Sequence, residues 1–541
     1  MQTSPPGAGR RRSFVQVLGR RRLAILAVML VVVGCAGLAA FAFRSVPPQI
    51  RVAGLENGGV LNGAETKNGR LELVAQGGTS LDGLTVSLDG EPAKTRRDGD
   101  RLLVETPGLD DGAHELTVAA DGNLGLTQTT RRSFTVDTTA PRLTIEKAQA
   151  ESLRAPATIR GHVEGARTVT VGGAEVKVGD DGAFSHRLAE PAPEVEVRAV
   201  DEGGNETAEN ATVLVPYPDT RAVHITAIGW TSKALRDPIL KMAEEGRINA
   251  VQLDIKDEDG EIGYDSQVPL ARKIGAAKGY YDAKKALREL HERDVRVVGR
   301  IVAFRDPILA RASWKSGARE RVVQDANGAP YGGGGHYGKL SFTNFANEEV
   351  REYNMDLAVE AAELGFDDIL YDYVRRPDGR MSSFTFPGLG DRKPTERIAS
   401  FMAETRERVR PEGAFLGACV FGVAATRPTE IAQDIPAMAE HSDYIAPMVY
   451  PSHWAAGEYG VSNPNADPYK IVKRSLADFE KQAKGSGAVI VPWLQDFSLG
   501  VAYGDDEVAA QVKAARDNGM DSFILWNAGA RYHAGGLTPR R

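Results

Sequence analysis

The chain has 541 residues, more than a single hydrophobic core ordinarily supports, so its length predicts several domains. Hydrophobic residues make up 42% of the sequence and charged residues 26%, which is the balance of a folded globular protein and argues against a disordered chain. The formal net charge of −7 argues against a nucleic-acid-binding protein, because such proteins normally present a basic surface to the phosphates.

The first 43 residues have the pattern of a membrane anchor. Residues 1–22 form a basic tail with arginine clusters at 10–12 and 20–22, and residues 23–43 are an uninterrupted apolar run. A helix over that run would be roughly 31 Å long, enough to cross a bilayer. Because basic flanks stay in the cytoplasm, the pattern predicts a single-pass protein of the cell membrane whose C-terminal bulk is extracellular.

Other interpretations of this segment remain open. The residues VVGC at 32–35 resemble a lipoprotein cleavage box ending at Cys35, although the residues that follow stay apolar. The residues RRSFV at 11–15 resemble a twin-arginine export signal, and cleavage after Ala42 would release a secreted protein. All of these alternatives also send the bulk of the chain outside the cytoplasm.

Residues 46–217 have the period-two alternation of half-buried strands. Runs at 84–90, 101–106, 114–120 and 132–137 are separated by Asp-Gly and Gly-Asp turns, and a second group of such runs ends at 213–218. The segments DGAHELTVAADG…FTVDTTAP and GDDGAFSHRL…VRAVDEGGNET resemble bacterial immunoglobulin-like modules. The sequence therefore predicts two all-β sandwiches, at 46–140 and 141–217, which the resemblance suggests act as spacers.

From residue 218 the pattern changes to strand and helix in alternation. Strand-like runs lie at 222–230, 249–257, 295–304, 366–374, 414–422, 442–451, 487–497 and 520–529, and amphipathic helical segments separate them. Alternation of this kind predicts a parallel sheet, and eight repeats suit a closed (β/α)8 TIM barrel over residues 218–541. No glycine-rich phosphate loop of an open doubly wound sheet is present in the sequence.

In such a barrel the functional face lies at the carboxyl ends of the strands. Carboxylates, guanidinium groups, amides and large aromatic residues end the predicted strands here. They are Trp230, Asp254, Lys256, Arg300, Asp372, Tyr373, Arg375, Tyr450, His453, Trp493, Gln495, Asp496, Trp526 and Asn527. Because no His or Cys pair has the spacing of a zinc site, neither a metal nor another cofactor is expected.

This mixture of side chains predicts a sugar-binding site. Tryptophan and tyrosine rings stack on the apolar faces of sugar rings, while charged and amide groups bind the hydroxyls. Cleavage of a glycosidic bond ordinarily needs one protonated and one ionised carboxyl group. Asp372 is the predicted nucleophile or base, because Arg375 nearby favours its ionised form. Asp496 or Asp254 is the predicted proton donor, and the other rim residues are predicted to bind substrate.

Several of these residues have a structural alternative. Asp372 could instead form a structural salt bridge with Arg300 or Arg375, and Asp254 could belong to a solvated acidic turn, DIKDEDG. Lys256 could merely neutralise the nearby acids.

Ordered blocks in the same region carry a family resemblance. VQLDIKDEDGEIGYDS, RIVAFRDPILA, ELGFDDILYDYVRRPDG, VFG, DYIAPMVYPSHWAAGEYG, PWLQDF and ILWNAG together resemble a glycoside hydrolase domain family with a (β/α)8 barrel, over about residues 222–532. The resemblance implies hydrolysis and suggests Asp372, at the end of the fourth strand, as nucleophile. One departure is Cys419, which stands in GACVFG where the family tends to have an acid.

Together these observations predict a membrane-anchored extracellular enzyme that hydrolyses a glycosidic bond in a cell-wall or extracellular polysaccharide. Its expected partners are that glycan and, through residues 23–43, the membrane, with no nucleic acid. The alternative, favoured by Cys419, is a non-catalytic carbohydrate-binding or wall-organising protein on the same barrel, because a buried thiol cannot replace a carboxylate at neutral pH without strong activation.

Overall fold

The structure is a computed structural model that describes residue 29 and residues 49–540, with gaps at 54, 68, 77–79, 107, 122–126, 193 and 332–337. The chain divides into two compact units. One comprises Met1–Ala148, Ile159–His186 and Glu194–Thr212, and the other comprises Gln149–Thr158, Arg187–Pro193 and Val213–Arg541.

The predicted anchor lies almost wholly outside the described residues. Of residues 23–43, only Met29 is described, so the membrane-spanning helix stays a prediction. Within the described part of the chain, no helix combines the length and the apolar character needed to cross a membrane.

The first predicted sandwich is present as two antiparallel-rich sheets around an apolar core. Its strands alternate as the sequence predicts: in QIRV at the start, Ile50 and Val52 are buried while their neighbours are exposed. Leu73, Val104 and Phe134 belong to the core. One sheet has the order β1 (Gln49–Val52), β3 (Arg70–Gln76), β7 (Arg101–Glu105), β6 (Thr95–Asp98). The other has the order β2 (Val60–Asn62), β9 (Thr127–Asp137), β8 (Gly112–Asp121), β4 (Leu84–Leu88), β5 (Glu91–Pro92), and a short helix, α2 (Gly63–Lys67), follows β2.

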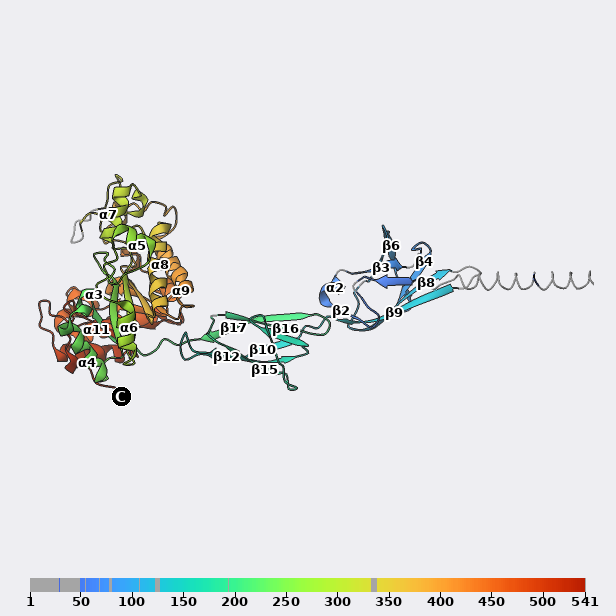
Figure 1. Ribbon diagram of the computed structural model, residues 1–541, viewed down its shortest axis with the longest axis horizontal. Helices are drawn as coiled ribbons and strands as arrows, with labels where there is room; N and C mark the ends of the chain where they lie inside the picture. The colour runs from blue at the N-terminus through green and yellow to red at the C-terminus, as the bar shows by residue number, and fades with distance from the viewer. Residues whose placement is uncertain are drawn as a thin grey trace, which may run out of the picture. The chain divides into compact units, whose positions relative to one another are not determined.

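The second predicted sandwich also has two sheets, and Figure 1 shows β16 and β17 in one layer and β10, β12 and β15 in the other. In β12, every second residue from Ala157 to Val163 is buried, which is the period of a strand with one face in a core. One sheet has the order β10 (Arg142–Ile145), β12 (Ala157–Glu164), β15 (Ala183–Leu188). The other has the order β11 (Ala148–Gln149), β17 (Glu206–Leu214), β16 (Glu194–Val200), β13 (Thr168–Val171), β14 (Ala174–Val176).

The C-terminal region is a closed barrel of eight parallel strands, as predicted. The sheet runs β22-β21-β20-β19-β18-β26-β25-β23-β24, and a further pairing of β22 with β23 closes it. Because Pro492 has no N–H to donate, the seventh predicted strand is interrupted and occurs as β24 and β25. The strands are β18 (Arg221–Ile225), β19 (Ala250–Lys256), β20 (Arg296–Val302), β21 (Asp368–Asp372), β22 (Phe415–Phe421), β23 (Tyr444–Met448), β24 (Val489–Ile490), β25 (Trp493–Gln495) and β26 (Phe523–Trp526).

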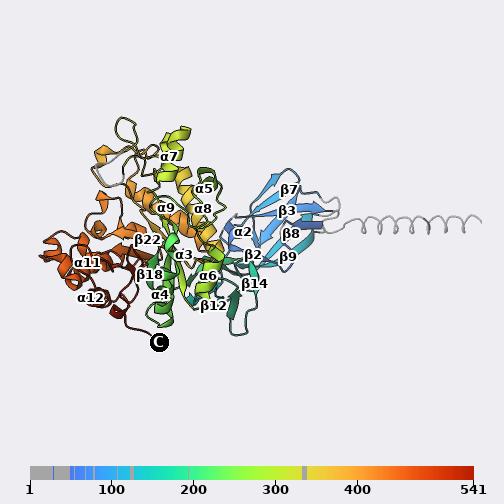
Figure 2. The same ribbon diagram turned by 60° about the vertical axis from the view of Figure 1, so that its left-hand side comes forward.

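Helices surround these strands, as Figure 2 shows. Their ends follow local sequence signals: Asn347 caps the N-terminus of α8 by accepting a hydrogen bond from the Val350 N–H, and Gly365, with φ of 109°, ends it. The helices are α3 (Ala227–Thr231), α4 (Lys233–Glu244), α5 (Pro269–Ile274), α6 (Ala283–His291), α7 (Pro307–Ser316), α8 (Glu348–Leu364), α9 (Pro394–Val409), α10 (Ile435–Ala439), α11 (Pro468–Ala483) and α12 (Asp505–Arg516).

Two strand ends differ from the sequence prediction. The first strand stops at Ile225, and the Thr226 hydroxyl then caps α3, so Trp230 lies on a helix rather than at a strand end. In β19 the pairing register with β20 shifts between Asp254 and Lys256. Such an irregularity breaks the alternation that would otherwise direct both side chains to the same face.

The amino-terminal end of the barrel is closed by residues that precede β18. Tyr217 packs against Phe415 and Tyr444, and its hydroxyl donates to Asp368 Oδ2 at 3.0 Å. Arg296 Nη2 donates to Asp368 Oδ1 at 2.5 Å. Burial outweighs this cation and raises the pKa of Asp368 to about 6. These polar groups hold the end opposite the functional face.

Candidate functional site

A cavity of about 350 Å³ opens at the carboxyl ends of the barrel strands. Its lining combines two carboxylates, one guanidinium group and many aromatic rings, which matches the kind of site that the sequence predicts. The lining residues are Glu258, Arg300, Asp372, Tyr373, Phe421, Gly422, Val423, Met448, Tyr450, His453, Trp454, Trp493 and Trp526.

One guanidinium group organises the acids of this cavity. Arg300 is 1% exposed, and its Nε and Nη2 donate to Asp372 Oδ2 at 3.1 and 2.7 Å. Its Nη1 donates to Asp254 Oδ1 at 3.0 Å, and Nη2 also bonds to Glu258 Oε1. Burial opposes the charge of Arg300, but the three carboxylates outweigh it and raise its pKa well above the usual value. Arg300 therefore stays charged and ties three strand ends together.

Asp372 is held rigidly at the end of β21. Besides its bonds to Arg300, its Oδ1 accepts a hydrogen bond from the Tyr373 backbone N–H at 2.7 Å. Tyr373 has φ of 48°, a left-handed conformation that is uncommon for a residue with a side chain and often marks functional sites. The cation beside Asp372 is thus Arg300 and not Arg375, to which the sequence analysis gave this role.

Arg375 has other partners than the one predicted. Its Nη1 donates to the Arg376 carbonyl at 2.9 Å and to Asp378 Oδ1 at 3.1 Å, while its guanidinium carbon lies 4.2 Å from the Phe421 ring centre. The side chain is 1% exposed and does not line the cavity. Arg375 therefore supports the wall of the cavity from behind.

Glu258 is the carboxylate that the sequence analysis missed. A solvated acidic turn after β19 was one of the alternatives that the sequence left open, but the backbone of this turn is fixed by Asp257, whose Oδ1 accepts from the Asp259 and Glu261 N–H groups. This turn directs Glu258 to Arg300. Burial raises the pKa of Glu258, but Arg300 lowers it by more, so the group is ionised in the free protein. The signal that could have found it is its spacing of four residues from Asp254.

Asp254 lies behind Arg300 and does not line the cavity. It is 1% exposed, and its Oδ1 also contacts His224 Nε2 at 3.0 Å. Burial raises its pKa, but His224 and Arg300 lower it by more, so Asp254 is held as an ionised carboxylate. It is suited to fixing Arg300 rather than to giving up a proton.

The aromatic residues predicted for the rim come together. The Trp493 and Trp526 rings are nearly parallel, at 10°, with centres 4.9 Å apart, and the Arg300 guanidinium lies 5.2 Å from the Trp526 ring centre. His224 stacks on Trp526 at 4.0 Å. Tyr450, 6% exposed, packs edge-on against His453, and burial lowers the pKa of His453. A sugar ring entering the cavity would thus meet several aromatic faces.

Asp496 does not fit the predicted role of second carboxyl group. Its Oδ1 contacts His533 Nδ1 at 2.6 Å, its Oδ2 accepts from the His533 N–H at 2.9 Å, and it does not line the cavity. Burial raises the pKa of Asp496, but this carboxyl group lies outside the cavity that Asp372 and Glu258 line. Asn527 braces the same loop by donating to the Asp496 carbonyl and to the Arg531 carbonyl at 2.7 Å.

Three further residues also lie outside the cavity lining. Gln495 is fully buried and accepts from Ser452 while its amide nitrogen donates to the Phe497 carbonyl at 2.9 Å. Trp230, on α3, is 3% exposed and belongs to the hydrophobic core. Lys256 points outward and donates to Asp306 at 2.9 Å and to Asn354 on α8 at 2.8 Å. The register shift in β19 explains this orientation of Lys256.

Cys419 lies in the barrel interior, fully buried. Burial raises the pKa of its thiol well above the usual value, and the negative charge of Asp372 adds to the effect. The thiol is therefore neutral and does not act as the acid that the family resemblance leads one to expect at this position.

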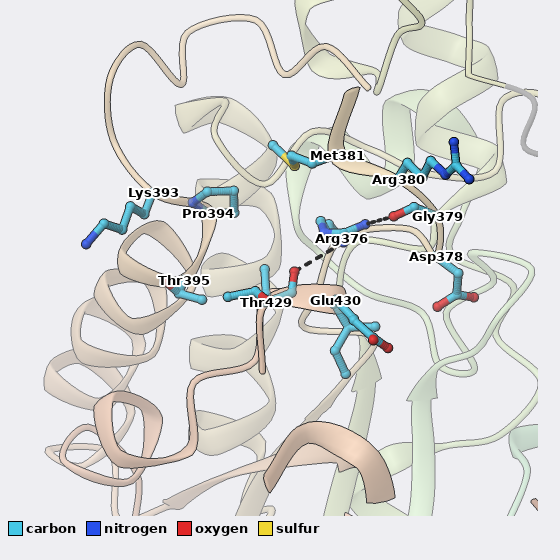
Figure 3. Close-up of a pocket in the computed structure, with 12 residues that line it drawn as sticks. Arg376, Asp378, Gly379, Arg380, Met381, Lys393, Pro394, Thr395, Thr429 and Glu430 are labelled. Carbon is cyan, nitrogen blue, oxygen red and sulfur yellow. Dashed lines mark hydrogen bonds between the residues drawn. The ribbon is translucent and has the colours of Figure 1, made fainter. Parts of the chain in front are cut away.

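A larger hollow, of about 700 Å³, is lined by residues from the segments that follow β21 and β22, and Figure 3 shows them. Arg376 sits at its centre, but its guanidinium already donates to the carbonyl oxygens of Gly379 at 2.9 Å and Thr429 at 3.1 Å. Among the residues that the structure describes, none of those lining this hollow is aromatic. The smaller cavity is the better candidate because it joins paired carboxylates to aromatic rings.

Within the described residues, no group of three or more His, Cys, Asp or Glu side chains is arranged to hold a metal ion. The carboxylates of the cavity are instead bound by Arg300.

Comparisons with known proteins add the following. Residues 141–217 match the family described as "Glucodextranase, domain B", an immunoglobulin-like module. A comparison with curated proteins finds no match. A crystal structure of a hypothetical protein from Ruminiclostridium thermocellum is 34% identical, with a TM-score of 0.31, and the match covers 36% of this chain and 96% of that one.

Two other solved structures share less sequence. The glycoside hydrolase domain of PgaB (BpsB) from Bordetella bronchiseptica is 14% identical, with a TM-score of 0.43, over 58% of this chain and 95% of that one. The spore cortex-lytic enzyme SleL from Bacillus megaterium is 12% identical, with a TM-score of 0.36, over 62% and 79%.

The barrel itself matches a family along nearly its whole length. Residues 222–532, more than half of the chain, match the family described as "Putative glycosyl hydrolase domain". The glycoside hydrolase-like character that the sequence predicts is confirmed, and the chain belongs to this family.

Proposed function

We propose that the barrel hydrolyses a glycosidic bond in a cell-wall or extracellular polysaccharide, on the outer side of a membrane to which residues 23–43 anchor it. The observation that carries this proposal is the pair of cavity carboxylates, Asp372 and Glu258, bound to the same nitrogen of Arg300. Stacked tryptophans beside them supply faces for a sugar ring.

The two carboxylates differ in a way that suits two roles. Asp372 is 3% exposed and fixed by Arg300 and by the Tyr373 N–H, so it is the nucleophile. Glu258 belongs to a turn, and its side chain is 31% exposed, so it is free to move toward a substrate and is the proton donor. In the free protein Arg300 keeps the pKa of Glu258 low. When a sugar displaces this contact, burial remains and raises the pKa, as a general acid requires.

The reaction then proceeds in two steps. Asp372 attacks the anomeric carbon while Glu258 protonates the glycosidic oxygen, so that the bond to the leaving sugar breaks and a glycosyl ester forms. Glu258, now ionised, takes a proton from water, and the resulting hydroxide cleaves the ester and frees Asp372. Because both carboxylates contact Nη2, their nearest oxygens lie within about 6 Å, two hydrogen-bond lengths, of each other. That distance favours retention over inversion, which needs about 6.5–9.5 Å.

A non-catalytic glycan-binding protein is the second candidate. It is favoured by the ionised state of Glu258 in the free protein and by the neutral Cys419 thiol in the barrel interior. Under this alternative, the same cavity binds sugar rings and releases nothing.

The test is the release of new reducing ends from purified bacterial cell walls and extracellular polysaccharides by the full chain. Glu258→Gln should lower the rate by about 100-fold or more, the usual contribution of a general acid or base. Asp372→Asn removes the nucleophile and should lower the rate at least as much. Glu430→Gln, an exposed carboxylate in the larger hollow, is the matched control and should leave the rate unchanged. Glycan binding without release by the wild type would reject hydrolysis, and full activity of Asp372→Asn would reject its assignment.

A further inference from the structure

Two hydrogen-bond donors in the cavity have no partner among the described residues. They are the indole Nε1–H of Trp493 and the hydroxyl of Tyr450. Both side chains line the cavity, and they are 1% and 6% exposed. Buried polar groups are nearly always hydrogen-bonded, and an indole N–H can only donate. The two donors thus lie on side chains that line the cavity, and an acceptor oxygen on a ligand bound against these side chains would satisfy them.

The charge of the cavity restricts which acceptor is suitable. Glu258, Asp372 and the underlying Asp254 are three carboxylates around one guanidinium, that of Arg300, so the site keeps a net negative charge even with His224 beside Asp254. His453 does not compensate, because burial lowers its pKa and favours the neutral ring. A carboxylate or phosphate on the ligand would be repelled, so the acceptor oxygen must belong to a neutral group.

Apolar surface lies beside these donors. Met448 and Phe421 line the cavity, and Tyr450 and Trp493 belong to one buried cluster with the neutral thiol of Cys419. A small apolar substituent is thus accommodated next to the two donors. A sugar hydroxyl alone would leave that surface without a partner.

We infer that the cavity binds the acetamido group of an N-acetylated amino sugar. Its carbonyl oxygen accepts from the Tyr450 hydroxyl or the Trp493 N–H, its methyl group lies against the apolar wall, and its N–H donates to Asp372. A free amino sugar carries a positive charge that the carboxylates would attract, but its ammonium group has no acceptor for the two donors. This inference rests on the proposed function to the extent that the cavity receives a sugar.

The test compares three small probes that differ in one substituent. They are the methyl β-glycosides of N-acetylglucosamine, glucosamine and glucose, added to the full chain carrying E258Q so that no probe is cleaved. Saturation-transfer NMR should show binding of the N-acetylated probe at least ten times tighter than the other two, with the strongest transfer at the acetyl methyl protons. Tyr450→Phe keeps the ring and removes the donor, and it should reduce this preference several-fold. Thermal unfolding confirms that this variant is folded.

The outcomes separate this inference from the proposed function. Equal or tighter binding of the glucose or glucosamine probe, no binding of the N-acetylated probe, or an unchanged preference in Tyr450→Phe would each overturn the acetamido assignment. Wild-type cleavage of glycans without N-acetyl groups would overturn it too, while leaving hydrolysis intact. A preference for the N-acetylated probe without cleavage of any glycan would keep the assignment and reject hydrolysis.

Discussion

At the scale of single residues, Arg300 is the centre of the site. It reaches carboxylates from three places in the sequence: Asp254 on β19, Glu258 on the turn after it and Asp372 on β21. A planar guanidinium with five donors can satisfy several carboxylates at once, which a lysine ammonium does not do in the same geometry. The acids of this site are thus positioned by a single side chain.

Replacing this side chain should destabilise the barrel as well as inactivate it. Arg300→Gln leaves the buried Asp254 and Asp372 and the partly exposed Glu258 without their cation, so the free energy of unfolding should fall by about 3–5 kcal/mol at pH 7. The loss should be smaller near pH 4, where the carboxylates take up protons. Urea unfolding at both pH values measures this difference. Arg380→Gln, an exposed arginine in the larger hollow, is the control and should change stability by less than about 0.5 kcal/mol.

At the scale of elements, the sequence predicted where the strands lie better than it predicted which way their side chains point. The eight strands and their order followed from alternation, because repeated hydrophobic periods are local signals. Asp372, Trp493 and Trp526 were correctly expected at the mouth of the barrel. Lys256 was also expected there, and this prediction is wrong. One register shift in β19 turns the Lys256 side chain to the other face of the sheet, and the amino-acid sequence shows no sign of such a shift.

The other misplaced or overlooked residues have causes both near to and far from them in the sequence. Trp230 follows a threonine cap that starts a helix, where the sequence was interpreted as one continuous strand. Asp496 pairs with His533, which lies 37 residues later and could not be matched to it by spacing. Glu258 was overlooked because acidic turns are usually solvated, and only the position of Arg300 gives this one a buried partner.

The outward orientation of Lys256 makes a second testable prediction. Its ammonium is fully buried and paired with Asp306, whose other oxygen caps α7 by accepting from the Leu309 N–H at 2.8 Å. Asp306→Asn keeps the cap but leaves the lysine charge unpaired, so stability should fall by about 3–5 kcal/mol. Adding Lys256→Met to Asp306→Asn should restore most of that loss, because an apolar side chain needs no counter-ion. Urea unfolding of the two single variants and the double variant measures the coupling, and additive losses would contradict it.

At the scale of the whole molecule, the described chain combines two sandwiches with one barrel, and the carboxylate-aromatic cavity belongs to the barrel. The two ends of this barrel use buried charge differently. At the end that carries the cavity, Arg300 outweighs burial at Glu258, and His224 together with Arg300 outweighs it at Asp254, so both carboxylates stay ionised. At the opposite end burial prevails over Arg296 and raises the pKa of Asp368. The stability of the barrel should therefore carry a pH dependence that comes from its closed end.

The direction of that dependence follows from the raised pKa. Asp368 titrates at about 6 in the folded protein but at its usual value of 3.8 when unfolded, so the folded state holds the proton more tightly. Its contribution to stability is fully present below pH 3.8 and is lost as the pH rises through 6. Asp368→Asn keeps the shape but cannot titrate, so the variant should lack this fall between pH 4 and pH 6.5. Urea unfolding of the wild type and the variant across that range gives the slope of the free energy of unfolding against pH for each protein. The contributions of the other acids are shared, so they cancel in the difference between the two slopes. Equal slopes would contradict the prediction, because they would mean that Asp368 binds its proton equally in the folded and the unfolded state. In that case Arg296 and the Tyr217 hydroxyl would offset the burial of Asp368 completely.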